Sequence, residues 1–329
     1  MSLSLGIDLG GSGSRVALRG ADGQRREFTG ERVGVTATGS SVPDVAVQLL
    51  RVARERWPEE FAELTGVGLG ATGLASLVAD PAALAEAIRV ESAAGGAADA
   101  SRSRPRVVVA LDAVTAHLGA LGGEAGATVA LGTGAIALGG DGRTTWRRVD
   151  GWGHLLGDRG GGAWIGRRGL EIAMRAHDGV EASGAALLAA GRARFGDPPG
   201  WPAQLYTRAD RAGVLAAFAP DVLALAADGD AVAAGIAAEA GAEAARSGVS
   251  ALMPGLPPRL AATGGLFRAG GVLAESFAAT IAELRPGVEL REPLGDPLDG
   301  ALVLAARAAR GELAGRGPFV WVAGDPASR

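Results

Sequence analysis

The pattern of apolar and polar positions predicts a chain of short buried strands followed by a mostly helical second half. Apolar residues spaced three and four apart predict a helix over 43–57, and Asp80-Pro81 has the composition of a helix start for 81–90. Strand-length apolar runs lie at 3–8, 15–18, 67–73, 107–111, 131–138 and 259–262. Helices are predicted over 163–177, 182–194, 208–226, 230–252, 267–284 and 297–312. The final dozen residues have no such pattern and are predicted to form a loose tail.

One arrangement of these elements occurs twice. The first strand ends in a glycine turn, a second strand follows, and Asp22-Gly23 then closes the segment. Residues 131–142 repeat this order, with Gly132-Thr133-Gly134 at the turn and Asp141-Gly142 at the close. The repetition favours a duplicated α/β unit, although a chain this rich in glycine could also produce it by chance.

Composition narrows the chemistry that is available. The chain has 329 residues, enough for about two domains, and a formal net charge of -4, which argues against a nucleic-acid partner. It contains no Cys, Lys or Asn, so thiolate catalysis, iron–sulfur ligation, a Walker-A lysine and a Schiff base are excluded. No charged leader or bilayer-length apolar run is visible, so we expect a cytoplasmic protein without membrane contact.

The first glycine turn is a candidate phosphate-binding loop. Backbone amides at Gly10 and Gly11 can approach an anion closely, and the hydroxyls of Ser12 and Ser14 add donors. Asp8, at the end of the preceding strand, is suited to a hydrated Mg²⁺. The alternative is a tight hairpin with no ligand. The glycine spacing does not fit a dinucleotide-binding fingerprint.

Asp112 ends a buried strand at the start of a helix. A carboxylate there can accept the proton of a hydroxyl that attacks a phosphoryl group, but the position taken alone favours an ordinary helix N-cap, which is the commoner role of Asp at such places. Thr133 and Gly134 form a second candidate phosphate loop, with a simple hairpin turn as the alternative.

Residues 150–162 concentrate glycines around one indole and two acids. Trp152 and Asp158 have the chemistry that binds sugars, namely a flat aromatic face and a carboxylate for paired hydroxyls. The alternative is a long ordered turn with Trp152 in the core and His154 in a structural hydrogen bond. Farther along, Gly264 and Gly265 after a strand would let a purine lie against bare backbone, unless they form a plain βα turn.

The order of these motifs resembles the actin-like ATPase superfamily of sugar kinases, actins and heat-shock chaperones. Residues 151–158 (GWGHLLGD), followed by 160 and 163–166, resemble the N-acetylglucosamine kinase branch, which is grouped with the ATPase activators of benzoyl-CoA reductase and 2-hydroxyacyl-CoA dehydratase. The resemblance implies an α/β fold of duplicated actin-like (ribonuclease H-like) ATPase domains with an interdomain cleft. The expected division is 1–113, 114–312 with helical elaboration, and a tail at 313–329.

The resemblance also implies roles for individual residues. Asp112 would be the catalytic base and contact the sugar, and Asp8 would hold Mg²⁺. ATP would be bound by Gly10, Gly11, Ser12, Ser14, Thr133, Gly134, Gly264 and Gly265, and the sugar by Gly151, Trp152, Gly153 and Asp158. Gly300 resembles the second connection between the domains. A homodimer is expected.

The implied reaction is ATP-dependent phosphorylation of the 6-hydroxyl of an amino sugar, with N-acetylglucosamine first. Relatives use an Asn on the substrate, whereas this chain has none and carries Ala135-Ile136 after its second loop. The substrate therefore stays open between N-acetylglucosamine, glucosamine, another hexose and a muramic-acid derivative. A non-catalytic nucleotide or sugar sensor and a partner-driven ATPase are the alternatives from other classes. The iron–sulfur activator role requires cysteines and is excluded.

Overall fold

The computed structural model describes residues 3–11, 13–20, 22–36, 39–94 and 104–324. It divides into two compact units, which are described separately. Unit 1 consists of Met1–Gly126, Gly140–Trp146 and Glu292–Arg329, and unit 2 of Ala127–Gly139 and Arg147–Arg291. These units differ from the ranges 1–113 and 114–312 predicted from the sequence, because the chain returns to unit 1 after residue 291.

Unit 1 is built on a mixed sheet with the strand order β13-β7-β6-β1-β2-β3. β1, β6 and β7 are parallel neighbours, whereas β2 and β3 add to β1 as an antiparallel meander. The strands are β1 (Ser4–Gly10), β2 (Gly13–Arg19), β3 (Arg25–Gly30), β6 (Gly66–Ala71), β7 (Arg106–Leu111) and β13 (Val320–Val322), and a small ribbon joins β4 (Val35–Thr36) to β5 (Gly39–Ser40). The helices are α1 (Val42–Arg56), α2 (Pro58–Ala62), α3 (Leu74–Leu77), α4 (Pro81–Ala93), α5 (Asp112–Ala120) and α14 (Pro297–Ala309).

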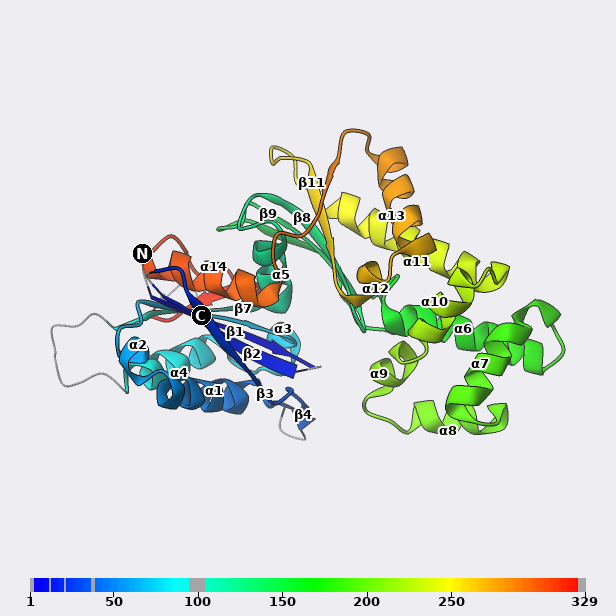
Figure 1. Ribbon diagram of the computed structural model, residues 1–329, viewed down its shortest axis with the longest axis horizontal. Coiled ribbons are helices and arrows are strands. Elements are labelled where there is room, and N and C mark those ends of the chain that lie inside the picture. Colours follow the sequence, from blue (N-terminus) through cyan, green and yellow to red (C-terminus); the bar gives the residue numbers. More distant parts are fainter. Residues whose placement is uncertain (1–2, 12, 21, 37–38, 95–103, 325–329) are drawn as a thin grey trace. The chain divides into compact units, whose positions relative to one another are not determined.

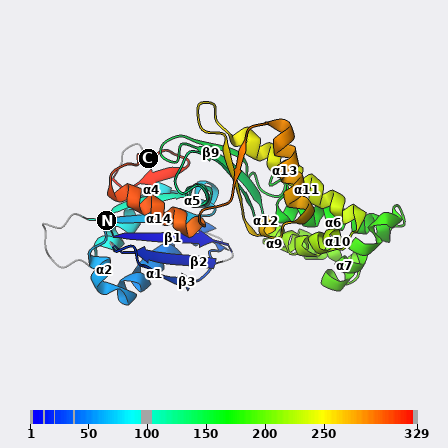
Figure 2. The ribbon, with the colours of Figure 1, turned by 45° about the horizontal axis from the view of Figure 1, so that its top comes forward.

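Helices cover both faces of this sheet. α1 and α4 pack together on one face, and α5 and α14 pack together on the other (Figure 1). Although α14 comes from the far end of the chain, it lies along β1 and β6, and the turned view shows the same arrangement (Figure 2). Glycines permit this contact, because a methyl group at Gly66 or Gly68 would overlap the α14 carbonyl oxygens of Ala305 or Ala301.

Unit 2 has a sheet with the order β10-β9-β8-β11-β12 and a large helical part. Its strands are β8 (Gly126–Leu131), β9 (Ala135–Gly140), β10 (Trp146–Asp150), β11 (Arg259–Thr263) and β12 (Glu289–Arg291). Its helices are α6 (Gly162–His177), α7 (Ala185–Phe195), α8 (Trp201–Tyr206), α9 (Arg211–Ala216), α10 (Ala219–Ala227), α11 (Ala231–Ala251), α12 (Gly265–Arg268) and α13 (Gly271–Leu284). Phe218, Trp164 and Ile236 belong to one apolar core that joins the helices to the sheet.

The predicted repetition is present in the two sheets. In each, a strand is followed by its hairpin partner, and its other neighbour is a parallel strand: β6 beside β1, and β11 beside β8. The α/β fold with two such sheets is the actin-like architecture that the sequence implies.

Several predicted elements need correction. The helix over 208–226 is two helices, α9 and α10, with Pro220 at the start of the second. The helix over 267–284 is likewise interrupted, since Gly270 and Gly271 have φ angles of 67° and 65° between α12 and α13. The predicted tail contains β13, which pairs antiparallel with β7 and buries Trp321.

Among the described residues, no single helix is long and apolar enough to cross a membrane. The pair Arg211–Ala227 and Ala231–Ala251, bent by 117°, meets the length and composition requirement only when both are taken together.

Candidate active site

Asp112 lies at the point where β7 passes into α5. It is the first residue of the helix, with Leu111 at the N-cap position, and its Oδ1 accepts a hydrogen bond of 2.8 Å from the Ala113 amide. A second hydrogen bond comes from the Thr72 side chain, just beyond β6. Burial, with a smaller contribution from the negative charge of Asp8, raises the pKa of Asp112 to about 6 despite these bonds. A carboxyl group with this pKa is suited to exchange protons near neutral pH.

Asp8 lies on β1 and forms a chain of ion pairs at the same end of the sheet. Its Oδ2 is 2.8 Å from Arg15 on β2, and Arg15 is also 2.6 Å from Asp296, which caps the start of α14. Burial raises the pKa of Asp8, although Arg15 opposes this effect. No group of three or more acidic or imidazole side chains suited to a metal occurs in the part of the chain that the structure describes. A single carboxylate such as Asp8 still fits Mg²⁺ that keeps its waters and phosphate ligands.

The first glycine turn links β1 to β2. Gly10 closes β1, and Gly11 is exposed with open space where a side chain would lie. Ser12 lies outside the described residues. Ser14 is 1 % exposed, and its hydroxyl packs beside Gly30 without a hydrogen-bond partner among the described residues. In this conformation Ser14 therefore faces the protein interior, which its sequence context does not predict.

The turn between β8 and β9, which is the second candidate phosphate loop, is hydrogen-bonded to the start of α6. The amides of Gly162 and Ala163 donate hydrogen bonds of 2.8 Å to the carbonyl oxygens of Gly132 and Thr133. The Thr133 side chain remains exposed. This arrangement presents a hydroxyl and a glycine backbone beside a helix N-terminus, which is a favourable environment for an anion.

The glycine-rich segment after β10 is organised by Asp150. Its carboxylate accepts hydrogen bonds of 2.7 Å from the Asp158 amide and 2.8 Å from the Arg159 amide. Asp158 has a φ of 55°, and its Oδ1 accepts a bond of 3.0 Å from the Gly153 amide. Burial raises the pKa of Asp158. Asp150 is thus the organising acid of this loop, a role that the sequence does not reveal because Asp-Gly is also a common turn.

Trp152 projects from this loop and is 63 % exposed, so the alternative of a core tryptophan is wrong. The Arg148 guanidinium lies 3.9 Å from the ring centroid and covers one face of the indole. The carboxylate of Asp158 lies over Gly134, where a methyl group would collide with it. Asp158, a sugar-binding candidate, is therefore a direct neighbour of the candidate phosphate turn between β8 and β9.

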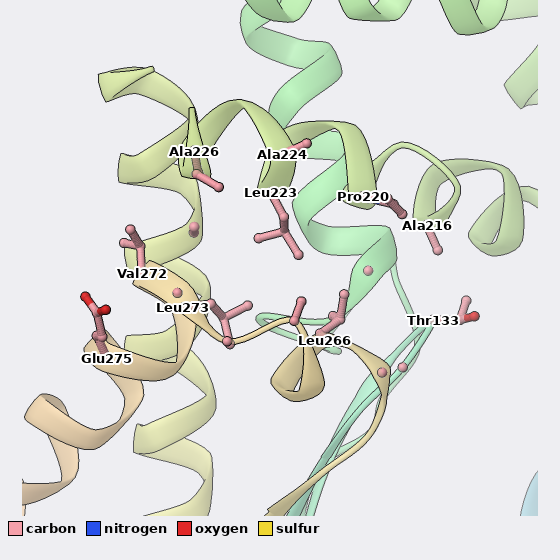
Figure 3. A pocket seen from close by; sticks show the side chains of 18 residues that line it. Thr133, Ala216, Pro220, Leu223, Ala224, Ala226, Leu266, Val272, Leu273 and Glu275 are labelled. Carbon is pink, nitrogen blue, oxygen red and sulfur yellow. The ribbon is translucent and has the colours of Figure 1, made fainter. Parts of the chain in front are cut away.

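A pocket of about 880 Å³ opens beside the same turn within unit 2. Its lining includes Thr133, Leu266 and, from α10, Leu223 (Figure 3), together with the backbone of Gly162 and Gly265. Glu275 lies opposite Thr133 in this view. Gly264 allows the turn between β11 and α12 to lie against the end of β8. It has a φ of 107°, and a methyl group there would overlap the carbonyl oxygen of Leu131. Apolar walls with glycine backbone at one end suit a purine nucleotide.

The structure thus groups the predicted residues within each unit. Unit 1 brings together Asp8 and Asp112, and unit 2 brings together Thr133, Gly134 and Asp158, while Gly264 lies against Leu131 just before the same turn and Gly265 lines the pocket. Gly300, which resembles the second connection between the domains, lies within α14, where it contacts α5. The pocket residues of α9 and α10 could not be found from the sequence, since their apolar pattern is the same as that of a helix core.

Known proteins similar to this chain are consistent with these observations. The N-acetylmuramic acid/N-acetylglucosamine kinase of Clostridium acetobutylicum is 26% identical over 180 residues, 54% of this chain; the match thus spans about half (55%) of that relative's length. A structure from Chromobacterium violaceum, provisionally assigned as an N-acetylglucosamine kinase, is 26% identical, with a TM-score of 0.67 and coverage of 92% of this chain and 99% of the other.

A ROK family glucokinase from Streptomyces griseus, solved with glucose and AMPPNP, has a TM-score of 0.59 at 19% identity and covers 93% and 100% of the two chains. At this identity the likeness concerns the fold alone. The model of the BadF/BadG/BcrA/BcrD ATPase family matches residues 5–305, which include the candidate site residues of both units. The chain belongs to the BadF/BadG/BcrA/BcrD ATPase family.

Proposed function

We propose that this protein is an ATP-dependent kinase that phosphorylates the 6-hydroxyl of an amino sugar, with N-acetylglucosamine as the first candidate. The observation that carries the proposal is Asp112: a carboxyl group with a pKa of about 6 at the end of a buried strand, in a chain of an ATPase family. Relatives named as sugar kinases support the same reaction class.

In the proposed reaction Asp112 accepts the proton of the sugar hydroxyl as the hydroxyl oxygen attacks the γ-phosphorus of ATP. The bond from that phosphorus to the β,γ-bridging oxygen breaks, and ADP leaves with the electron pair. Thr133, Gly134 and the pocket beside Gly265 hold the nucleotide, and Gly10, Gly11 and Ser12 complete the phosphate contacts. Mg²⁺ near Asp8 would neutralise charge on the phosphates.

The sugar would be held by the loop around Trp152 and Asp158. An exposed indole offers a flat apolar face, the Asp158 carboxylate can accept hydrogen bonds from paired hydroxyls, and the amides of Gly151 and Gly153 lie in the same turn. Because the chain has no Asn, an acetamido group would have to be recognised by other donors. Glucosamine, another hexose and a muramic-acid derivative remain the alternative substrates. A homodimer is part of the same proposal.

The replacement Asp112→Asn tests the base directly. We expect sugar-dependent ADP release to fall by about 10²–10⁴-fold, which is the usual contribution of general base catalysis. Nucleotide binding and folding should persist, because an amide keeps the acceptor for Ala113 and has no charge to desolvate. Asp44→Asn, at an exposed carboxylate of α1, is the matched control. Full activity in Asp112→Asn would remove this residue from the mechanism.

A panel of amino and neutral sugars separates the kinase from its alternatives. ADP release stimulated by a sugar is the expected result, and the preferred sugar then identifies the substrate. Release of ADP without any effect of sugar would instead favour a partner-driven ATPase. Tight binding of sugar and nucleotide without turnover would favour a sensor.

A further inference from the structure

A second cavity, of about 580 Å³, lies in unit 1 at the other end of β1 from Asp8. Its distinctive lining residues are Ser4, Arg19, Arg307 and Arg310, with Gly20 and Gly122 supplying backbone. Asp8 pairs across the sheet with Arg15, whereas Ser4 pairs with Arg19, so the cavity is four residues along the strand from the catalytic carboxylates. None of the residues assigned to the proposed kinase reaction lines it.

Arg307 is the central cation of this cavity and is only 9 % exposed. Its guanidinium donates hydrogen bonds to the carbonyl oxygens of Gly142 and Gly123, the second at 2.7 Å. These two carbonyls use part of the five donors of the group. Burial lowers the pKa of Arg307, and the positive charges of Arg143 and Arg310 lower it further.

The acidic groups near Arg307 only partly balance the cations. Glu312 and Asp141 act on Arg307 in the stabilising direction, but Glu312 is itself bonded to Arg310, and Asp141 accepts three backbone amides of its own turn. Arg19 has Asp299 at 3.6 Å. A buried cation whose bonds go to carbonyl oxygens carries a desolvation cost that a bound anion would offset.

Ser4 supplies a second, independent observation. The residue is 3 % exposed, and its hydroxyl has no hydrogen-bond partner among the described residues. Because cross-strand partners in an antiparallel pair point to the same face, Ser4 and Arg19 share the face that α14 covers. A buried hydroxyl without a partner, beside guanidinium groups in a cavity, provides an unused donor for an oxyanion.

We propose that this cavity, which we call the arginine cavity (Ser4, Arg19, Arg307 and Arg310), binds the phosphate group of a small molecule. Guanidinium groups match phosphate oxygens in geometry and charge, and the volume has room for more than the phosphate itself. The shared chemistry of the ligand is a phosphate dianion, supplied either by inorganic phosphate or by a phosphomonoester such as a hexose 6-phosphate. The proposal does not depend on the sugar-kinase reaction.

Calorimetric titration of the full chain with inorganic phosphate, and separately with glucose 6-phosphate, tests the site. The double replacement Arg19→Gln/Arg310→Gln removes two half-exposed cations without touching buried Arg307, so folding should be retained. We expect binding to weaken by about tenfold or more, the usual effect of losing charged hydrogen bonds. The control Arg26→Gln/Arg246→Gln, at exposed arginines that also pair with one carboxylate each, should bind as the unaltered chain does.

Thr133→Ala separates this site from the nucleotide loop and should also leave phosphate binding unchanged. The ligand that binds more tightly identifies the source of the phosphate. Failure of both ligands to bind at millimolar concentration would overturn the proposal. So would equal binding by the two double variants, or a loss confined to Thr133→Ala.

Discussion

At the scale of single residues, Asp112 shows how position sets both geometry and acidity. The strand before it is buried, the helix after it begins at once, and its carboxyl group receives hydrogen bonds from Ala113 and Thr72. Burial and the nearby charge of Asp8 outweigh those bonds, so the pKa rises to about 6. The strand-end position was visible in the sequence, but Thr72 as a partner was not, since it lies forty residues earlier.

The raised pKa predicts an acid limb in the rate profile. Below a pH of about 6 Asp112 is protonated and cannot accept the hydroxyl proton, so kcat/KM should fall about tenfold per pH unit there and level off above it. A coupled assay from pH 5 to 8, with the Asp44→Asn control, measures the profile. Burial also raises the pKa of Asp8 and Asp158. The midpoint of the pH profile is therefore assigned to the carboxyl groups of the site together, and not to Asp112 alone. A rate that is flat down to pH 5 would contradict the role of Asp112.

Two adjacent glycines at the nucleotide pocket make a matched stability test. Gly264→Ala should destabilise unit 2 by about 3 kcal/mol, because Gly264 has a φ of 107° and the new methyl group would overlap the Leu131 carbonyl. Gly265→Ala should change stability by less than about 1 kcal/mol, since its methyl group meets only the tip of Arg268. Denaturant unfolding measures both. Equal losses of stability in the two variants would mean that the close contact of Gly264 with Leu131 is not required for folding.

Residue chemistry alone predicts part of the candidate site. Asp112, Thr133 and Asp158 were found because each stands beside a strand end or in a glycine turn, where polar groups are unusual. The burial of Ser14 and the organising role of Asp150 were not found, since both depend on which side of a turn the backbone presents.

At the scale of elements, the inner strands and the capped helix α4 can be predicted from the sequence, whereas the edge strands β3, β10, β12 and β13 and the helix breaks are not among the predicted elements. Asp80 caps α4 as expected, and its Oδ1 accepts a bond of 2.9 Å from Ala83. Pro220 and the pair Gly270-Gly271 mark the breaks before α10 and α13, but the predicted helices run through them because apolar residues on both sides continue the helical spacing. β13 was missed because a three-residue edge strand has no periodicity of its own, and its pairing with β7 is decided by tertiary contact.

The contact between α5 and α14 holds α5 in place, and Asp112 is the first residue of α5. Gly300 lies at that contact, where a methyl group would overlap the Thr115 carbonyl oxygen. Gly300→Ala should therefore destabilise the protein by about 2 kcal/mol or more and lower kcat, because separating the helices moves the start of α5. Gly235→Ala, on the exposed side of α11 with no atom near, should instead stabilise by about 0.5–1 kcal/mol. Thermal unfolding and steady-state rates measure the two effects, and a neutral Gly300→Ala would show that the helices can separate freely.

At the scale of the whole molecule, two similar sheets carry different parts of the proposed reaction. Unit 1 holds the acidic residues Asp8 and Asp112, and unit 2 holds the pocket proposed for the nucleotide and the loop around Trp152 and Asp158. The repeated hairpins alone left a duplicated unit open against chance, and the fold could be predicted only because the order of all the motifs resembles that of the actin-like ATPases. The return of α14 to unit 1 could not be predicted, because it depends on the glycines of β1 and β6 that admit its backbone.

The central claim is that the chain transfers the γ-phosphoryl group of ATP to a sugar hydroxyl, and the product itself tests it most directly. Phosphorus NMR of a reaction containing ATP, Mg²⁺ and N-acetylglucosamine, repeated with glucosamine, glucose and N-acetylmuramic acid, identifies the phosphorylated atom. We expect a new monoester signal coupled to the C6 protons of at least one of these sugars, and its absence in Asp112→Asn. Conversion of ATP to ADP and free phosphate with no phosphorylated sugar in any reaction would contradict it.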